Sequence, residues 1–551
     1  MSKEKIKPKL FSVMKTYSKE QFFKDLIAGV IVAIIALPLS IALALASGVG
    51  PEEGIYTAIV AGFLISFLGG SRVQIAGPTA AFATIVAGIV AKDGKDGLIV
   101  ATIMAGIFLV IMGFLRLGSL IKFIPYTITT GFTAGIAVTI LLGQVKDFLG
   151  VTYLDGAKPV ETIDKVKAVI NNISTVNFQA VIVGVVCLAI LIVWPKISAK
   201  IPGSLIAVLV GILMVKFLNM NVNTIGDLYT IDSKLPVPHF PHVTKDIIIS
   251  QIPNALTISI LAAIESLLSC VVADSMIASK HRSNMELIAQ GVGNMGSALF
   301  GGIPATGAIA RTAANIKNGG RTPIAGMVHS VVLVLVLVVL MPYAALIPMP
   351  TIAAILFIVA YNMCGYKTFA HLCKTAPKSD ILVLIGTFVL TVVFDLVVAI
   401  EIGMLAACVL FMKRMSDESE VRGWKYFDDE DDADGIELRK VPKEVRVYEI
   451  SGPMFFGAAD RLADITTKDF TKALVIRMRG VPALDATAMH SLNVLADTCE
   501  KKGIQLVFSH VNEQPMHVME KDGFIEFVGQ DNFRENIMEA ISYGESLVQN
   551  A

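Results

Sequence analysis

Long apolar segments separated by short polar loops occupy residues 1–413 of the chain. Runs such as 26–46 and 98–115 are each long enough, as helices, to cross ~30 Å of hydrocarbon. The pattern predicts fourteen spans, two of them short, near residues 25–46, 53–69, 78–91, 97–115, 123–148, 178–194, 202–218, 250–273, 285–300, 307–317, 322–341, 346–362, 379–394 and 395–412. We therefore predict a polytopic α-helical membrane protein.

Composition and charge agree with this prediction and add an orientation. Of the 551 residues, 54% are hydrophobic, and the mean hydropathy is +0.69. The 46 basic and 46 acidic residues cancel, so net charge gives no reason to expect a nucleic-acid partner. Seven lysines precede Asp25, and alternate loops are basic. Positive loops stay inside, so we expect both termini to be cytoplasmic. The expected location is the plasma membrane.

Two short segments interrupt the pattern at matching places. "LGGSRVQIAGPTAAF" occupies residues 68–82, and "FGGIPATGAIARTAA" occupies 300–314. Thr79 follows Gly70 by nine residues, and Arg311 follows Gly302 by nine. The two copies are seven spans apart, which inverts one relative to the other. Short Gly/Pro-interrupted segments in two halves of a transporter are typical of its binding site.

Helices that begin inside the membrane direct unpaired N–H groups and a positive dipole end at that point. Two such ends facing each other would bind an anion through the backbone. We expect the Thr79 hydroxyl to add a donor and Arg311 to add positive potential. The alternative is that both segments are loops packed between bundles, with glycine allowing close contact.

One acidic residue, Glu265, lies deep in the apolar run "ISILAAIESLLSCVV", with Ser269 one turn later on the same face. A charge in this position is costly, so we expect a function or a partner. Glu265 is predicted either to hold a proton or Na⁺ beside the anion, or to be a structural partner of Arg311. His329, in a Val/Leu-rich run, is expected to be a core histidine with satisfied hydrogen bonds.

The composition changes after the last span. Residues 416–435 contain nine acidic and two basic residues, which is typical of a solvated linker. Strands are then predicted at 445–450, 473–478 and 504–508, with a helix over 485–501, which indicates a small α/β domain. The expected organisation is a cytoplasmic segment (1–24), a transmembrane domain (25–413), an acidic linker (414–442) and a soluble domain (443–551).

These motifs together resemble the SulP anion permeases, the family of prestin and pendrin. The resemblance lies in "GVIVAIIALPLSIALALASGVGPEEGIYTAIV", "GGSRVQIAGPTA", the segment "VVADSMIASKHRSNMELIAQGVGNMGSALFGGIPATGAIARTAANIKNGGRTPIAG" and a C-terminal STAS domain. It implies fourteen spans in a seven-plus-seven inverted repeat, with a core bundle (spans 1–4 and 8–11) and a gate bundle (spans 5–7 and 12–14). It also implies elevator-type movement of the core and a homodimer.

The resemblance also implies substrate contacts from the first, third and tenth spans: Pro38, Leu39, Leu43, Pro78, Thr79, Ala80, Ala308, Ala310 and Arg311. Several relatives have Gln where Leu39 stands and Ser where Ala310 stands, so backbone N–H groups would matter more here. The eighth span is similar to cyanobacterial bicarbonate members, which use Na⁺ with an acid four residues before a hydroxyl, here Glu265 and Ser269. Proton-coupled plant sulfate members carry Glu at this position, which favours H⁺.

The soluble domain resembles anti-sigma-factor antagonists, whose regulated Ser follows an Asp. In "GVPALDATAMHSL", Asp485 matches, but Ala486 stands in place of that Ser. Thr487 follows and is expected to cap the helix. Asp485 and Thr487 are the regulatory candidates, although a docking role toward a cytoplasmic partner or a second subunit is the better expectation.

The predicted function is a secondary active inorganic anion transporter. Sulfate uptake with H⁺ or Na⁺ is expected first. Bicarbonate with Na⁺, or a C4-dicarboxylate with H⁺, is the alternative, and a channel or exchanger is the alternative of another class. No nucleophile–base constellation, metal-ligand pattern or phosphate loop is readable in useful context, so we expect neither an enzyme nor a resident cofactor.

Overall fold

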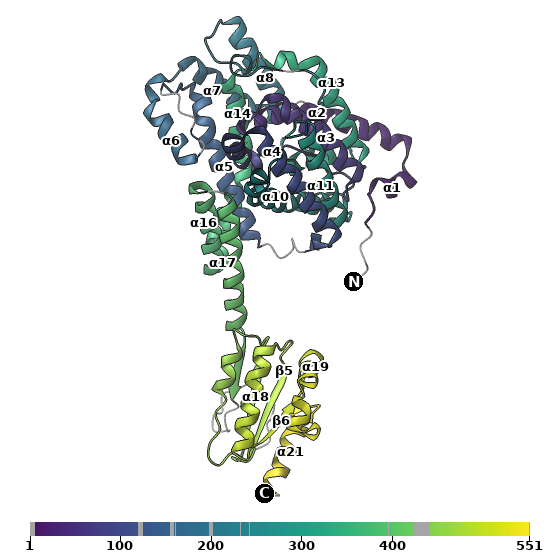
Figure 1. Cartoon of the computed structure of the whole chain (residues 1–551), viewed down its shortest axis with the longest axis vertical. Coiled ribbons are helices and arrows are strands. Elements are labelled where there is room, and N and C mark those ends of the chain that lie inside the picture. The colour runs from purple at the N-terminus through teal and green to yellow at the C-terminus, as the bar shows by residue number, and fades with distance from the viewer. Residues whose placement is uncertain are drawn as a thin grey trace. The chain divides into compact units, whose positions relative to one another are not determined.

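The computed structural model describes residues 6–119, 125–154, 159, 161–197, 202–231, 233–241, 243–394, 396–423 and 441–549. It divides into two compact units, 1–404 and 405–551. The first unit is helical and the second is built on a sheet (Figure 1). The predicted linker lies partly outside the described residues.

The helical unit follows the predicted spans. Its span-forming helices are α2 (Lys19–Ala46), α3 (Pro51–Leu68), α4 (Ala83–Phe114), α5 (Tyr126–Leu149), α7 (Phe178–Ile197), α8 (Gly203–Phe217), α10 (Lys245–Ile277), α11 (Ser283–Leu299), α12 (Ile309–Lys317), α13 (Ile324–Ala344), α14 (Met349–Cys364) and α16 (Lys378–Val393). The last span-forming helix, α17 (Leu396–Asp417), contains the boundary between the two units. A kink at Gly94, where φ is 68°, divides α4 into the third and fourth spans.

Eight helices in the described part of the chain are long and apolar enough to cross a membrane by length and composition. The remaining predicted spans coincide with the second half of α4 and with α8, α11, α12, α16 and α17. Short elements before and between the spans were not predicted, because they lack a long apolar run: α1 (Leu10–Val13), η1 (Met14–Thr16), α6 (Thr162–Asn171), η4 (Ile173–Thr175), α9 (Ile225–Leu228) and α15 (Tyr366–Thr375).

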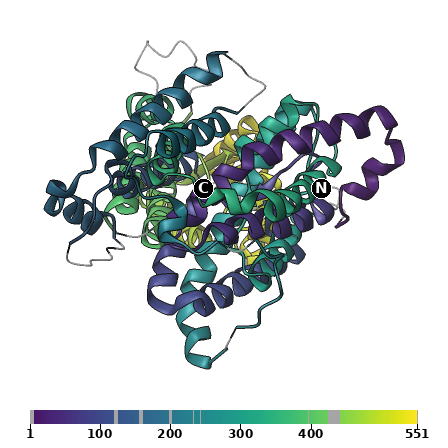
Figure 2. The ribbon, with the colours of Figure 1, turned by 90° about the horizontal axis from the view of Figure 1, so that it is seen from above.

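The helices of this unit form two groups, which Figures 1 and 2 show from two directions. In one group, α11 packs against α3 and α4, and α13 packs against α2 and α3. In the other, α5 packs against α14 and α16, and α7 packs against α8 and α14. The predicted core and gate bundles are confirmed for these helices.

The second unit contains a five-stranded sheet in the order β3 (Glu420–Gly423), β4 (Val445–Ser451), β5 (Ala473–Gly480), β6 (Gln505–Ser509) and β7 (Phe533–Arg534). β3 is antiparallel to β4, and the other pairs are parallel. The three predicted strands are therefore confirmed, but β3 lies inside the segment predicted as linker. Its short, charged sequence "EVRG" carries no strand pattern, because it is an exposed edge.

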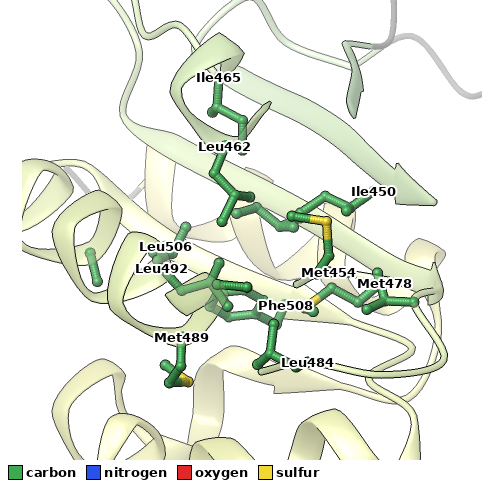
Figure 3. Close-up of a cluster of buried hydrophobic side chains, with 14 of the residues drawn as sticks. Ile450, Met454, Leu462, Ile465, Met478, Leu484, Met489, Leu492, Leu506 and Phe508 are labelled. Atoms are coloured by element: carbon green, nitrogen blue, oxygen red, sulfur yellow. The ribbon is translucent and has the colours of Figure 1, made fainter. Parts of the chain in front are cut away.

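Helices cover the sheet of the second unit, and their bounds are α18 (Ala486–Lys501), α19 (Glu513–Asp522), α20 (Phe524–Val528) and α21 (Ile537–Gln549), with η5 (Ala459–Asp464) and η6 (Gln530–Asn532). Figure 3 shows the larger hydrophobic cluster, which includes Ile450, Met454, Leu462, Ile465, Met478, Leu484, Met489, Leu492, Leu506 and Phe508. A smaller cluster joins α21 to the other face of the strands.

The cap of α18 differs from the prediction. Asp485, not Thr487, is the N-cap: its Oδ1 accepts from the N–H of Ala488 at 2.9 Å, and its Oδ2 accepts from the N–H of Phe456 at 2.9 Å. Thr487 lies exposed in the first turn. A cap at Thr487 would start the helix at Ala488, whereas α18 begins at Ala486, two residues earlier, so the carboxylate of Asp485 stands at the capping position.

Candidate anion-binding site

The two interrupted segments meet in a short antiparallel strand pair. β1 (Ala76–Gly77) pairs with β2 (Thr306–Gly307), with Ala76 opposite Gly307 and Gly77 opposite Thr306. All four residues are buried. This register relates Ala76 to Thr306 by a two-fold axis, so Thr79 corresponds to Ile309. The equal spacing from the Gly-Gly pairs suggests Arg311 as its counterpart instead, but β1 begins six residues after Gly70 whereas β2 begins four residues after Gly302.

α12, from the second half of the chain, holds the segment that precedes β1. Asn315 donates from Nδ2 to the carbonyl oxygen of Val73 at 2.8 Å. The N–H of Ile75 donates to Oγ1 of Thr312 at 3.0 Å, and the carbonyl of Ile75 accepts from the N–H of Ala308 at 2.8 Å. Non-helical backbone at membrane depth needs such partners.

The Gly-Gly turns are also held by the opposite half. Oε2 of Glu286 on α11 accepts from the N–H groups of Gly70 and Ser71 at 2.8 and 3.1 Å. Oγ1 of Thr57 on α3 accepts from the N–H of Ile303 at 2.7 Å. Each half therefore fixes the interrupted segment of the other, and neither segment is a free loop.

Arg311 extends from α12 to the start of the first short helix. Its Nη2 donates to the carbonyl oxygen of Pro78, and the side chain is buried. Gly77 makes room for it, because a Cβ at this position would overlap Nη1. The guanidinium thus places its charge beside the backbone where η2 (Ala80–Phe82) and α4 begin.

Glu265 joins both interrupted segments. Its Oε2 accepts from Oγ1 of Thr79 at 3.1 Å and from Oγ1 of Thr306 at 3.2 Å. Thr79 precedes the first short helix, and Thr306 lies in β2. The predicted alternative, in which Glu265 is the ion-pair partner of Arg311, is not the arrangement among the described residues.

The two serines near Glu265 have different surroundings. Oγ of Ser266 accepts from the N–H of Gly307 at 3.1 Å, which ties α10 to β2. Oγ of Ser269, the predicted partner of Glu265, is buried and has no hydrogen-bond partner among the described residues. Ser269 therefore keeps a free polar atom in the same helix as Glu265.

The other predicted contacts lie on three elements. Pro38 and Leu43 are buried in α2 and Leu39 is half-buried, and α2 packs against α12. Ala80 is the first residue of η2, Ala308 is the N-cap of α12, and Ala310 lies exposed in its first turn. Pro38, inside α2, removes a backbone donor there.

Thr306 and Ser266 were missed from the sequence. Helical periodicity relates Glu265 to Ser269, one turn later, whereas Ser266 turns toward β2 from the next position. Thr306 had a usable signal, since it stands one residue before the last glycine of "GGIPATG". Without the strand register nothing indicated that it faces Glu265.

Comparisons with known proteins agree with this architecture. The sulfate permease family profile matches residues 22–387, and the STAS domain profile matches residues 438–540. The chain is 39% identical over 524 residues to the "Putative sulfate transporter YvdB" of Bacillus subtilis, covering 94% of this chain and 97% of the relative. It is 32% identical over 504 residues to the bicarbonate transporter BicA of a Picosynechococcus strain, covering 87% of each.

Solved structures show the same fold. The transmembrane domain of a cyanobacterial BicA covers 70% of this chain, and 98% of that structure is matched, with 30% identity and a TM-score of 0.64. Murine Slc26a9, described as an anion transporter in the inward-facing state, matches 98% of this chain and 94% of its own with 18% identity and a TM-score of 0.87.

The chain belongs to the sulfate permease family and carries a C-terminal STAS domain. It has the family fold of fourteen spans in an inverted repeat. It is thus an anion transporter of the multi-pass membrane type and not an enzyme.

Proposed function

We propose that this protein is a secondary active transporter that takes up an inorganic anion together with a cation by elevator-type movement of the core bundle. The observation that carries the proposal is the position of Glu265, whose single carboxylate is hydrogen-bonded to Thr79 of the first interrupted segment and Thr306 of the second. Because this carboxylate contacts both halves of the site, gain or loss of a proton or a cation on it can alter the hydrogen bonds of both.

The anion is proposed to bind at the start of the two short helices, near Thr79, Ala80 and Ala308–Arg311, with α2 closing one side. Free N–H groups at helix starts attract anions. Arg311 adds charge, and its contact with the carbonyl of Pro78 places that charge next to the first helix. Small residues at both helix starts allow close approach.

Coupling follows from hydrogen-bond directions. An ionised Glu265 can only accept, so the hydroxyl hydrogens of Thr79 and Thr306 both point at it. A proton on Glu265 makes it a donor to one of these oxygens, and that threonine hydrogen becomes free for an anion. Na⁺ would act similarly, since it takes the oxygen lone pairs of the carboxylate and hydroxyls, with Ser269 as a further oxygen.

Sulfate is the proposed first substrate, supported by the names of relatives such as the Bacillus subtilis protein. Bicarbonate with Na⁺ is the second candidate, supported by the similarity to BicA, and a C4-dicarboxylate with H⁺ is the third. We further propose a homodimer in the plasma membrane with both termini cytoplasmic, and a STAS domain that docks a cytoplasmic partner or the second subunit.

The test is uptake into proteoliposomes. Labelled sulfate, bicarbonate and succinate are offered under an imposed H⁺ gradient, an imposed Na⁺ gradient, or neither. We expect one cation gradient to drive accumulation above the external concentration, and Glu265→Gln to abolish that accumulation while anion binding persists. Asp246→Asn is the matched control, because Asp246 is an exposed acid at the start of the same helix.

Uptake that only equilibrates with the membrane potential would instead indicate a channel. Strict dependence on a counter-anion would indicate an exchanger. Accumulation that Glu265→Gln leaves unchanged would remove Glu265 from the coupling mechanism.

A further inference from the structure

The buried histidine on α13 lacks the partners expected of a core histidine. His329 has no solvent exposure, yet neither ring nitrogen has a hydrogen-bond partner among the described residues. Nη1 of Arg311 is likewise buried and without a partner in the described part of the chain. Unsatisfied polar atoms are rare in protein interiors, so the two groups call for a common explanation.

Both groups border the same side of β1. A Cβ at Gly77 would overlap Nη1 of Arg311 and lie 3.6 Å from Cβ of Ala58. A Cβ at Gly62, one turn after Ala58 on α3, would lie 3.3 Å from the carbonyl oxygen of Ala76 and 3.9 Å from Cδ2 of His329. Because Ala58 and Gly62 carry a small side chain or none, α13 and the Arg311 side chain can both lie close to β1 at this face of α3.

Ser330 follows His329 on α13 and adds a hydroxyl group to this region. Oγ of Ser330, next to His329, lies 2.9 Å from the same Cβ position on Gly62 and already donates to the carbonyl of Ala58 at 3.2 Å. The Nη1 donor of Arg311, the imidazole of His329 and the hydroxyl oxygen of Ser330 thus all lie near β1. A buried water molecule typically makes two to four such hydrogen bonds.

We propose that His329 is a positioning residue for Arg311: its neutral ring accepts, through one internal water molecule, the hydrogen bond of Nη1 and so fixes the guanidinium against the carbonyl of Pro78. A neutral imidazole suits this role because it accepts a hydrogen bond and adds no second positive charge. Water-mediated bonds of this kind are nearly as favourable as direct ones. The proposal rests on the proposed anion site, where Arg311 supplies the charge.

The test compares His329→Leu, which removes the acceptor, with His329→Gln, which keeps one. In proteoliposome uptake we expect His329→Leu to raise the KM for the anion by roughly two- to tenfold, the range for one hydrogen bond, with little change in the maximal rate. His329→Gln should restore most of the affinity. In an Arg311→Lys background, which lacks the guanidinium fork, His329→Leu should add nothing.

A second measurement does not need a known substrate. Hydrogen exchange at residues 79–82 of the full-length protein should be faster in His329→Leu than in the wild type, and near wild type in His329→Gln. Unchanged exchange, or an additive KM effect in the Arg311→Lys background, overturns the positioning role. Absence of uptake by the wild type with the expected exchange pattern would count against the proposed function alone.

Discussion

Gly77→Ala tests whether the position of Arg311, and not merely its charge, determines anion affinity. The new Cβ would overlap Nη1 and touch Cβ of Ala58 at 3.6 Å. Gly77 does not have a positive φ, so the backbone of β1 accepts alanine without strain. Because Nη1 is the far end of a flexible side chain, we expect the guanidinium to move and the strand pair to remain.

The magnitude follows from the contact that is lost. The displaced guanidinium no longer donates to the carbonyl of Pro78, and a hydrogen bond from a charged group contributes about 1.5–3 kcal/mol. If this difference passes entirely into anion binding, the KM rises by roughly 10- to 150-fold, since ~1.4 kcal/mol corresponds to tenfold. Partial relaxation of the side chain would place the result at the lower end.

The assay is the initial rate of anion uptake into proteoliposomes as a function of anion concentration, with the thermal stability of each variant measured in detergent. Gly88→Ala is the matched control, because Gly88 lies in α4 and a Cβ there meets no atom within 4 Å. It should leave the KM unchanged and stabilise the helix by about 0.5–1 kcal/mol. A KM for Gly77→Ala within twofold of wild type would refute the reasoning.

Three further predictions concern single contacts. Thr79→Val removes one of the two hydroxyls on Glu265 and should weaken anion binding in equilibrium titrations about fivefold or more, whereas an unchanged titration would remove Thr79 from the site. Asp485→Ala should destabilise α18 by ~1 kcal/mol by hydrogen exchange, and Thr487→Ala should stay within ~0.5 kcal/mol, since only Asp485 caps the helix. Burial raises the pKa of Cys499 to about 11, so the folded thiol stays protonated where the unfolded thiol ionises. STAS stability should therefore be full below about pH 8.5 and fall as pH rises toward 11, and Cys499→Ala should flatten that fall in denaturant melts.

The spans could be predicted from the sequence because hydrocarbon imposes a length and a composition on every crossing helix. Glu265 and the two interrupted segments were found for the same reason, since each violates that rule. Thr306 was not found, because its contact with Glu265 depends on the register of two residues in each strand. β3 was not found either, since four residues at a sheet edge have no core-facing pattern to detect.

The role expected for His329 failed in an instructive way. Its apolar neighbours in sequence suggested an ordinary interior position, and it is indeed buried. Its sequence neighbours could not reveal that His329 lies near Gly62 of α3. Nor could they reveal that the guanidinium of Arg311, from α12, approaches the same strand, β1. Hydrogen-bond satisfaction is a property of tertiary contacts, and local patterns carry little information about it.

The hydrogen bonds between α12 and the segment before β1 can form only after both segments have been synthesised. Asn315 and Val73 are separated by 242 residues. At roughly 5–20 residues per second, the ribosome needs about 10 to 50 seconds between the two. During that interval the backbone groups of residues 73–78 must find other partners, such as water, lipid headgroups or an insertase. The first half of this transporter is therefore expected to need a chaperone-like environment until α12 has been synthesised.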